Sequence, residues 1–209
     1  DAIQLGIITT AASATVGSGM VSLTATTSSI VDAQNLGNAN NTDATVNVTA
    51  SGLRLSAGVG VGQSVNHLET NVATVSARAT SGGIYLLESN GVTVGDVAVT
   101  VNRVKDDGTV PDALRQSDAT QSDVVITSGN GSIVLTTGGS LTLYDGTAAA
   151  EGKAINAISG NVRLDVTGTL TLESAVDAGS GNVTLYASGL IEQKAAGDIF
   201  TTGGTIDVE

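Results

Sequence analysis

The densest group of acidic side chains lies between Asn102 and Asp123, a stretch that holds five of the chain's 20 Asp and Glu residues. Within it Asp106, Asp107 and Asp112 lie close together around a glycine, and carboxylate oxygens are the ligands that calcium prefers. Their spacing is not that of an EF-hand loop, which needs carboxylates at alternate positions and a glutamate at the twelfth. Calcium binding is one hypothesis for this stretch, and no bound ion is the other.

Residues suited to catalysis are sparse. His67 is the only histidine, which excludes metal sites built from several histidines. Any Ser-His-Asp arrangement would depend on it, and the polar connection from Gln63 to His67 predicts a solvated side chain. Enzymes that cleave acidic polysaccharides use clustered carboxylates and usually aromatic platforms, and aromatic residues make up 2% of this chain. The sequence predicts no enzyme and no cofactor, with a carbohydrate-binding or polysaccharide-degrading protein as the alternative.

Two kinds of outward-facing column are worth considering as binding surfaces. Tyr144, Asp165 and Tyr186 are each 21 residues apart, so a 21-residue repeat would place them in one exposed ladder that could contact sugars. The other interpretation is three unconnected surface residues at a corner. Regular Thr-x-Thr arrays suit ice binding, but the examples at 24–26 and 167–171 are local and no threonine column is expected to repeat, so ice binding is less favoured.

A repeat every 21 residues is what would position these side chains. Glycine-led phrases begin at Gly139, Gly160 and Gly181, and each contains an apolar-x-apolar pair. Looser copies elsewhere fit turns of about 21 to 29 residues. Because successive side chains of a strand face opposite ways, Leu164 and Leu185 are expected inside.

Arg163 and Thr184 are expected outside for the same reason. One turn of such a coil cannot bury its own apolar face, so turns must stack on one another. The sequence predicts an all-β fold: a parallel β-helix, or solenoid, formed by one chain over 1–209 with about eight or nine coils. The alternative is a string of β-sandwich modules, although such modules need about 100 residues each and usually a buried Trp or Tyr.

One segment, 102–123, interrupts the coil pattern and is predicted to be an insertion loop between 97–101 and 124–126. It holds the only proline, Pro111, which could begin a short helical turn. Insertions between coils are where solenoids carry binding functions, although a solvated loop that covers one edge is the favoured interpretation. The candidate partner-contact residues are Asp106, Asp107, Asp112, Arg115 and Asp118.

Charge and hydropathy limit the partners. The net charge of −12 and only eight scattered basic residues make nucleic acid an unsuitable partner, because phosphate backbones need a basic footprint. No run of 18 apolar residues is present, so no membrane-spanning helix is expected. The chain starts without Met or a signal peptide and stops within the strand phrase Thr205–Glu209. We therefore expect a fragment of a longer protein whose export signal lies elsewhere.

Several phrases resemble a known family. The segments Gly19–Thr26, Ile30–Asp32, Gly58–Gly62 and His67–Ala77 resemble the degenerate repeats of filamentous-haemagglutinin-like exoproteins, which are giant bacterial adhesins. The resemblance implies a right-handed parallel β-helix, secretion to the bacterial cell surface, and a role as a stalk or adhesive fibre. It also implies a surface glycan or protein receptor as partner, beside neighbouring coils of the parent protein, and brings no catalytic residues.

Overall fold

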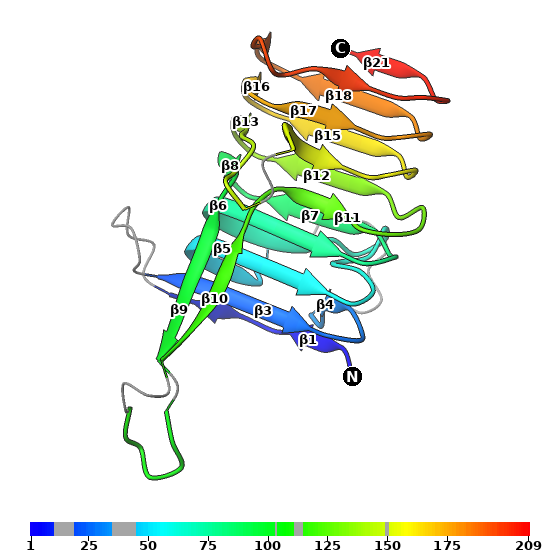
Figure 1. Ribbon diagram of the computed structural model, residues 1–209. Coiled ribbons are helices and arrows are strands. Elements are labelled where there is room, and N and C mark those ends of the chain that lie inside the picture. The colour runs from blue at the N-terminus through cyan, green and yellow to red at the C-terminus, as the bar shows by residue number, and fades with distance from the viewer. Residues whose placement is uncertain (11–18, 35–44, 103, 111–114, 149–150) are drawn as a thin grey trace.

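The computed structural model describes residues 1–10, 19–34, 45–102, 104–110, 115–148 and 151–209, with 102 and 115–117 described by their backbone alone. Within these ranges the chain is all-β, with 21 strands and no helix. Figure 1 shows the chain winding in successive turns from the N-terminal to the C-terminal end of one elongated body. The predicted all-β class is confirmed.

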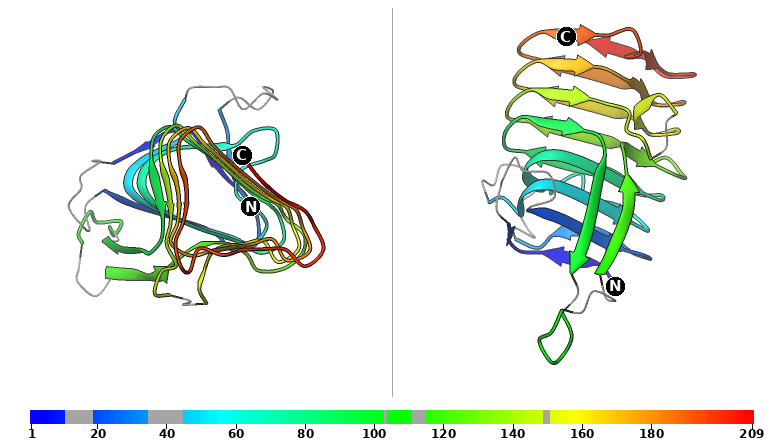
Figure 2. Two further views of the ribbon diagram at one scale, coloured as in Figure 1. Left: turned by 90° about the horizontal axis from the view of Figure 1, so that it is seen from above. Right: turned by 60° about the vertical axis from the view of Figure 1, so that its left-hand side comes forward.

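Parallel pairing between successive turns builds the body. Seventeen strands of the described residues form one network of hydrogen-bonded pairs. The three strands of one turn pair with the three strands of the next, for example β11 with β14, β12 with β15 and β13 with β16. Viewed from above, the turns superpose with a triangular outline (Figure 2). The sandwich alternative, which needs antiparallel sheets, does not describe this pairing.

The strands group by the face of the triangle on which they lie. The first face carries β1 (Ile3–Leu5), β4 (Ile30–Asp32), β7 (Ile84–Glu88), β12 (Ile133–Thr137), β15 (Val162–Val166), β18 (Val183–Ala187) and β21 (Ile206–Val208). The second carries β8 (Val92–Val94), β13 (Leu141–Leu143), β16 (Leu170–Leu172) and β19 (Ile191–Gln193). The third carries β11 (Val124–Ile126), β14 (Lys153–Asn156), β17 (Ala175–Asp177) and β20 (Ile199–Phe200).

Long strands replace this regular pattern in the N-terminal turns, where β2 (Ile8–Thr9) and β3 (Met20–Ala25) pair with β5 (Val48–Ala57), and β5 pairs with β6 (Leu68–Ala79). β6 pairs in turn with β7, β8 and β11, so this one strand passes along all three faces. β5 begins at Val48 and continues without a break through Ser51 and Gly52 to Ala57.

Side chains that point inward form columns through the stack. One column runs without a break through eight turns by parallel pairing: Ile3, Ile30, Val61, Ile84, Ile133, Val162, Val183 and Ile206. Its six inner members are at most 1% exposed. Leu164 and Leu185 are also fully buried, whereas Arg163 is exposed and Thr184 half-buried, so the predicted alternation is confirmed.

Glycines allow successive turns to approach closely at one corner. A Cβ atom added to Gly160 would overlap the carbonyl oxygen of Gly131, and one added to Gly181 would overlap that of Gly160. The same holds for Gly204 above Gly181. The glycines that open the phrases at Gly160 and Gly181 are therefore required by the backbone spacing at this corner, not only by turn formation. Gly139, which opens the first phrase of the sequence repeat, lies at a different corner, against Gly91.

An antiparallel hairpin leaves the stack between β8 and β11. Its strands, β9 (Val97–Asn102) and β10 (Arg115–Gln121), pair from Asn102 opposite Arg115 to Val97 opposite Gln121, with a bulge near Asp118. Figures 1 and 2 show the hairpin lying along the side of the body and crossing the turns that contain β5 and β3. Its strands lie against the body, whereas the tip at 104–110 extends beyond the stacked turns.

The hairpin is packed on the outer surface of these turns. Val97 and Val99 are buried while Ala98 and Thr100 are exposed, so one face of β9 contacts the body. Gln121 Nε2 donates to the carbonyl oxygen of Leu55 at 2.8 Å. The expected start of the insertion at Asn102 is thus corrected to Val97, because a Val-x-Val-x-Val pattern is the same in a coil strand and in a hairpin strand.

Candidate functional site

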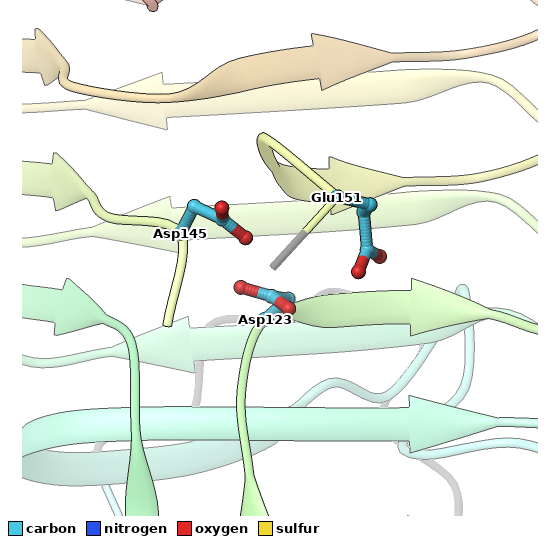
Figure 3. A group of neighbouring side chains, drawn as sticks. All are labelled: Asp123, Asp145 and Glu151. Carbon is cyan, nitrogen blue, oxygen red and sulfur yellow. The ribbon is translucent and has the colours of Figure 1, made fainter. Parts of the chain in front are cut away.

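Three carboxylates meet where the hairpin rejoins the stack. Asp123 directly precedes β11, Asp145 follows β13, and Glu151 lies shortly before β14. Because β11 and β14 are adjacent in the stack, the connections that lead into them are neighbours. One carboxylate oxygen from each residue lies within 4.8 Å of the others. In Figure 3 the Asp123 carboxylate faces that of Asp145, with the carboxylate of Glu151 beside it.

Backbone amides hold two of these carboxylates in place. The amide of Gly146 donates to Asp123 Oδ1 at 3.3 Å, and the amide of Gly152 donates to Asp145 Oδ2 at 3.0 Å. The backbone N–H of Asp145 donates to Ser174 Oγ at 2.8 Å, which ties the loop to the next turn. Each aspartate thus has one oxygen engaged by the protein.

The remaining aspartate oxygens are buried without a hydrogen-bond partner. These atoms are Asp123 Oδ2 and Asp145 Oδ1, and the Asp123 residue is 0% exposed. Burial raises the pKa of Asp123 to about 6, and repulsion from Asp145 and Glu151 acts in the same direction. The nearby hydroxyl of Ser122 and the hydrogen bond from the Gly146 amide oppose the shift. Negative charge concentrated around the buried Asp123, with Asp145 half-buried and Glu151 exposed, is the main electrostatic feature of this site.

Both legs of the hairpin touch the loop that carries Asp145. Asp96, just before β9, accepts hydrogen bonds from the backbone amide and the hydroxyl of Thr147, each at 2.8 Å. A side chain at Gly146 would overlap Asp96 and Ser122. The acidic cluster therefore lies at the junction of the hairpin base with the 144–152 connection.

The residues predicted as a partner-contact loop do not come together as one cluster. Asp106 and Asp107 are exposed in the hairpin tip, where Asp107 Oδ1 accepts hydrogen bonds from the amide and hydroxyl of Thr109 at 2.9 and 2.6 Å. These bonds lower the pKa of Asp107. Asp118 lies further along β10, opposite Val99.

The remaining members of that prediction are only partly placed. Arg115 and Gln116 are the first two residues of β10. Neither of them therefore belongs to the helical turn that was considered after Pro111. Asp112 and Pro111 lie outside the described residues. In the described part of the chain, the acidic residues grouped closely enough for a metal ion are Asp123, Asp145 and Glu151, away from the tip.

The predicted tyrosine–aspartate ladder is half correct. Asp165 and Tyr186 pair side by side on the first face, but the residue on the other side of Asp165 is Thr136. Tyr144 follows β13 at the end of the second face. The turn from Ile133 to Val162 spans 29 residues, not 21, so an equal spacing in sequence does not give an equal position in the stack.

A threonine column that the sequence analysis did not expect occurs on the second face. Thr74, Thr93, Thr142 and Thr171 are paired in register through four turns, and Glu192 follows. Each threonine is half-buried and has inward-facing neighbours on its strand. The column is one residue wide, unlike the Thr-x-Thr arrays considered for ice binding.

Buried polar residues occur in the N-terminal turns. His67 is 7% exposed with its ring centroid 5.8 Å from that of Tyr85, and burial lowers its pKa, so the expected solvated histidine is wrong. Asp32 accepts hydrogen bonds from Asn47 Nδ2 at 2.6 Å and Asn66 Nδ2 at 3.0 Å. Asp32 thus holds the side-chain amides of two asparagines inside these turns.

A pocket of about 310 Å³ lies at a corner beside the first face. Its lining includes Leu87, Thr136 and Thr167 and two acidic residues, Glu69 and Glu88. Glu88 is 1% exposed and accepts a hydrogen bond from the Thr70 hydroxyl at 2.7 Å. Burial raises the pKa of Glu88 to about 7, despite its hydrogen bonds, which lower it.

The acidic cluster had one usable signal in the sequence. Residues 144–152 join β13 to β14, whereas two residues join the equivalent strands β16 and β17. Asp145 and Glu151 lie in this extra length, and Asp123 ends the segment already recognised as an insertion. What could not be inferred is that the two irregular segments meet.

Comparison with known proteins found no matching family model, curated protein or solved structure. Among the described residues, no helix has the length and apolarity that crossing a membrane requires.

Proposed function

We propose that the chain is a right-handed parallel β-helix of eight turns and serves as a non-catalytic structural and adhesive segment of a larger, secreted bacterial surface protein of the filamentous-haemagglutinin-like class. The observation that carries this proposal is the eight-residue aliphatic column that parallel pairing links from Ile3 to Ile206. The right-handed coiling is proposed because connections between parallel strands of one sheet are almost always right-handed.

Stacked turns support the structural half of the proposal. Each turn is fixed by hydrogen bonds along the axis and by inward aliphatic side chains, so bending the body would break many contacts at once. The net charge of −12 favours solubility and discourages association between bodies of like charge. A stiff, acidic, elongated segment suits a stalk.

The hairpin tip supports the adhesive half. Val104 and Val110 are 66% and 49% exposed, and Asp106 and Asp107 are exposed between them. Apolar and charged groups presented together away from the stack are suited to a protein or glycan receptor. A carbohydrate ligand remains the second candidate, because Asp165 and the 40% exposed Tyr186 are adjacent on the first face.

The test is a tip-less variant. Since Asn102 and Arg115 face each other in the hairpin, residues 103–114 can be replaced by Asn-Gly, which closes a two-residue turn and keeps β9 and β10. We expect the wild-type chain to bind cells or a glycan array, and the variant to lose that binding while melting at the same temperature.

A companion variant, Asp165→Asn with Tyr186→Phe, separates the two surfaces. Loss of binding here but not in the tip-less variant would move the binding site to the first face. A folded wild-type chain that binds neither cells nor glycans would contradict the adhesive role and leave only the structural one.

A further inference from the structure

The geometry points to a calcium site formed by Asp123, Asp145 and Glu151 at the base of the hairpin. It lies away from the tip, where the sequence alone suggested calcium, and it does not depend on the adhesive role proposed above. An acidic cluster by itself is not a site, so the inference depends on what its buried oxygens lack.

The first step is the unpartnered oxygens. Asp123 is 0% exposed, yet its Oδ2 has no hydrogen-bond partner, and neither has the buried Oδ1 of Asp145. Buried carboxylate oxygens without partners are costly, because they lose hydration and gain nothing in return. Figure 3 shows the Asp123 carboxylate directed toward Asp145, into the space that the three acidic side chains share.

The second step is the lack of a compensating side chain. Among the side chains that the structure describes, the ion pairs are Lys153 with Asp177, Arg163 with Asp165, and Lys194 with Glu192. None of these pairs involves the cluster, and the lysine next to it in sequence, Lys153, is engaged by Asp177 at 2.7 Å. A bound cation would neutralise three carboxylates that otherwise repel one another.

The third step is the kind of ion. The donor set contains oxygen only, without histidine or cysteine, which favours a hard cation over zinc or copper. The cluster oxygens lie within 4.8 Å of one another. Magnesium demands a near-ideal octahedron of ligands, whereas calcium accepts flexible arrangements of carboxylates and water. Three carboxylates carried on connections between strands therefore suit calcium better.

Such an ion would join two segments. Asp123 directly precedes the strand that returns from the hairpin, while Asp145 and Glu151 lie near the two ends of the 144–152 connection. Binding would fix this connection against the hairpin base. It would stabilise the folded chain in proportion to the calcium concentration, because the unfolded chain cannot gather these carboxylates.

Terbium luminescence offers a direct probe, since terbium replaces calcium and is sensitised by a nearby tyrosine. Tyr144 directly precedes Asp145 in the sequence. We expect terbium emission excited through tyrosine, displaced by calcium more effectively than by magnesium, and a melting temperature that rises with calcium and falls with chelator. Tyr144→Phe should remove the emission without removing the calcium-dependent rise.

Matched variants locate the ion. Asp145→Asn with Glu151→Gln should weaken calcium binding by about tenfold or more. Asp106→Asn with Asp107→Asn makes the same change in net charge at the hairpin tip and should leave binding unchanged. The inference is overturned if the tip variant loses calcium, if the first variant keeps it, or if the wild-type chain shows no calcium response.

Asp123→Asn distinguishes calcium binding by Asp123 from a purely structural role of this residue. Asn is nearly isosteric and tolerates the left-handed backbone of Asp123, whose φ is 69°. In chelator the variant should melt at or above the wild-type temperature, because a buried repelling charge is removed. In calcium it should melt below wild type. A lower melting temperature in both conditions would contradict the proposed site.

Discussion

Neighbouring side chains on one short strand have opposite environments in this protein. In β15, Leu164 is 0% exposed, while Arg163 beside it is exposed and pairs with Asp165 through Nη2 and Oδ2 at 2.7 Å. The effect of a substitution depends on which way its position faces.

Leu185→Asp should unfold the chain or lower its stability by several kcal/mol, because an unpaired charge would enter a narrow apolar core. Thr184→Asp is the matched control on the adjacent outward position. It should change stability by less than about 1 kcal/mol, since the new carboxylate would lie on the outer surface between Arg163 and Asp207, whose opposite charges offset each other. Urea unfolding followed by circular dichroism compares the two, and equal effects would mean that the assigned facing is wrong.

For single residues, the sequence predicts well whether a side chain points inward or outward, and predicts poorly which residues become its neighbours. The inward positions of Leu164 and Leu185 follow from the two-residue period of a strand, which does not depend on other turns. Tyr144 was misplaced because its neighbour depends on the length of the intervening turn. His67 was misplaced because its burial depends on packing against Tyr85, for which a polar segment gives no signal.

Strands, corners and connections decide where side chains from distant segments meet. The short strands of the regular turns were expected from their apolar-x-apolar phrases. The hairpin was not, because Val97, Val99 and Val101 carry the same alternation whether they pair with a coil or with β10. The acidic cluster requires that hairpin and the long β13–β14 connection together, so it could not be inferred from either segment alone.

The glycine corner gives the prediction that belongs to this scale. Gly160→Ala should destabilise the chain by about 1–3 kcal/mol, because the added methyl group would overlap the backbone of Gly131 in the turn below. Gly6→Ala, where nothing lies within 4 Å of the new atom, should be close to neutral. Melting curves of both variants, recorded at one pH, provide the comparison. A neutral Gly160→Ala would show that the corner can widen.

The whole molecule combines a long apolar interior with strong negative charge. The charge of −12 is carried mainly outside, but Glu88 lies within the stack at 1% exposure. Its pKa is about 7 in the folded chain against 4.5 as the ordinary value. Between pH 4.5 and 7 the Glu88 carboxyl therefore stays protonated in the folded chain and is ionised in the unfolded chain. The free energy of unfolding of the whole chain consequently depends on pH in this range.

We expect stability to be highest below about pH 4.5 as far as Glu88 is concerned, and to fall as pH rises toward 7, by roughly 3 kcal/mol. Glu88→Gln should flatten this decline, since the amide can still accept from Val72 and donate to the Thr70 hydroxyl. Unfolding free energies measured in chelator at several pH values test it, and an unchanged slope in the variant would assign the decline to other groups.

The direction of the hairpin has a consequence for the order in which the chain can fold. Most turns need only the preceding turn as a template, so they could assemble one after another from either end. The hairpin is different, because β9 lies back across β3 and β5, which precede it in the chain. When a chain emerges N-terminus first, from a ribosome or through a pore, the turns that contain β3 and β5 can already be folded when Val97 and Val99 emerge. A chain that emerges C-terminus first leaves their apolar face uncovered until the last turns have appeared.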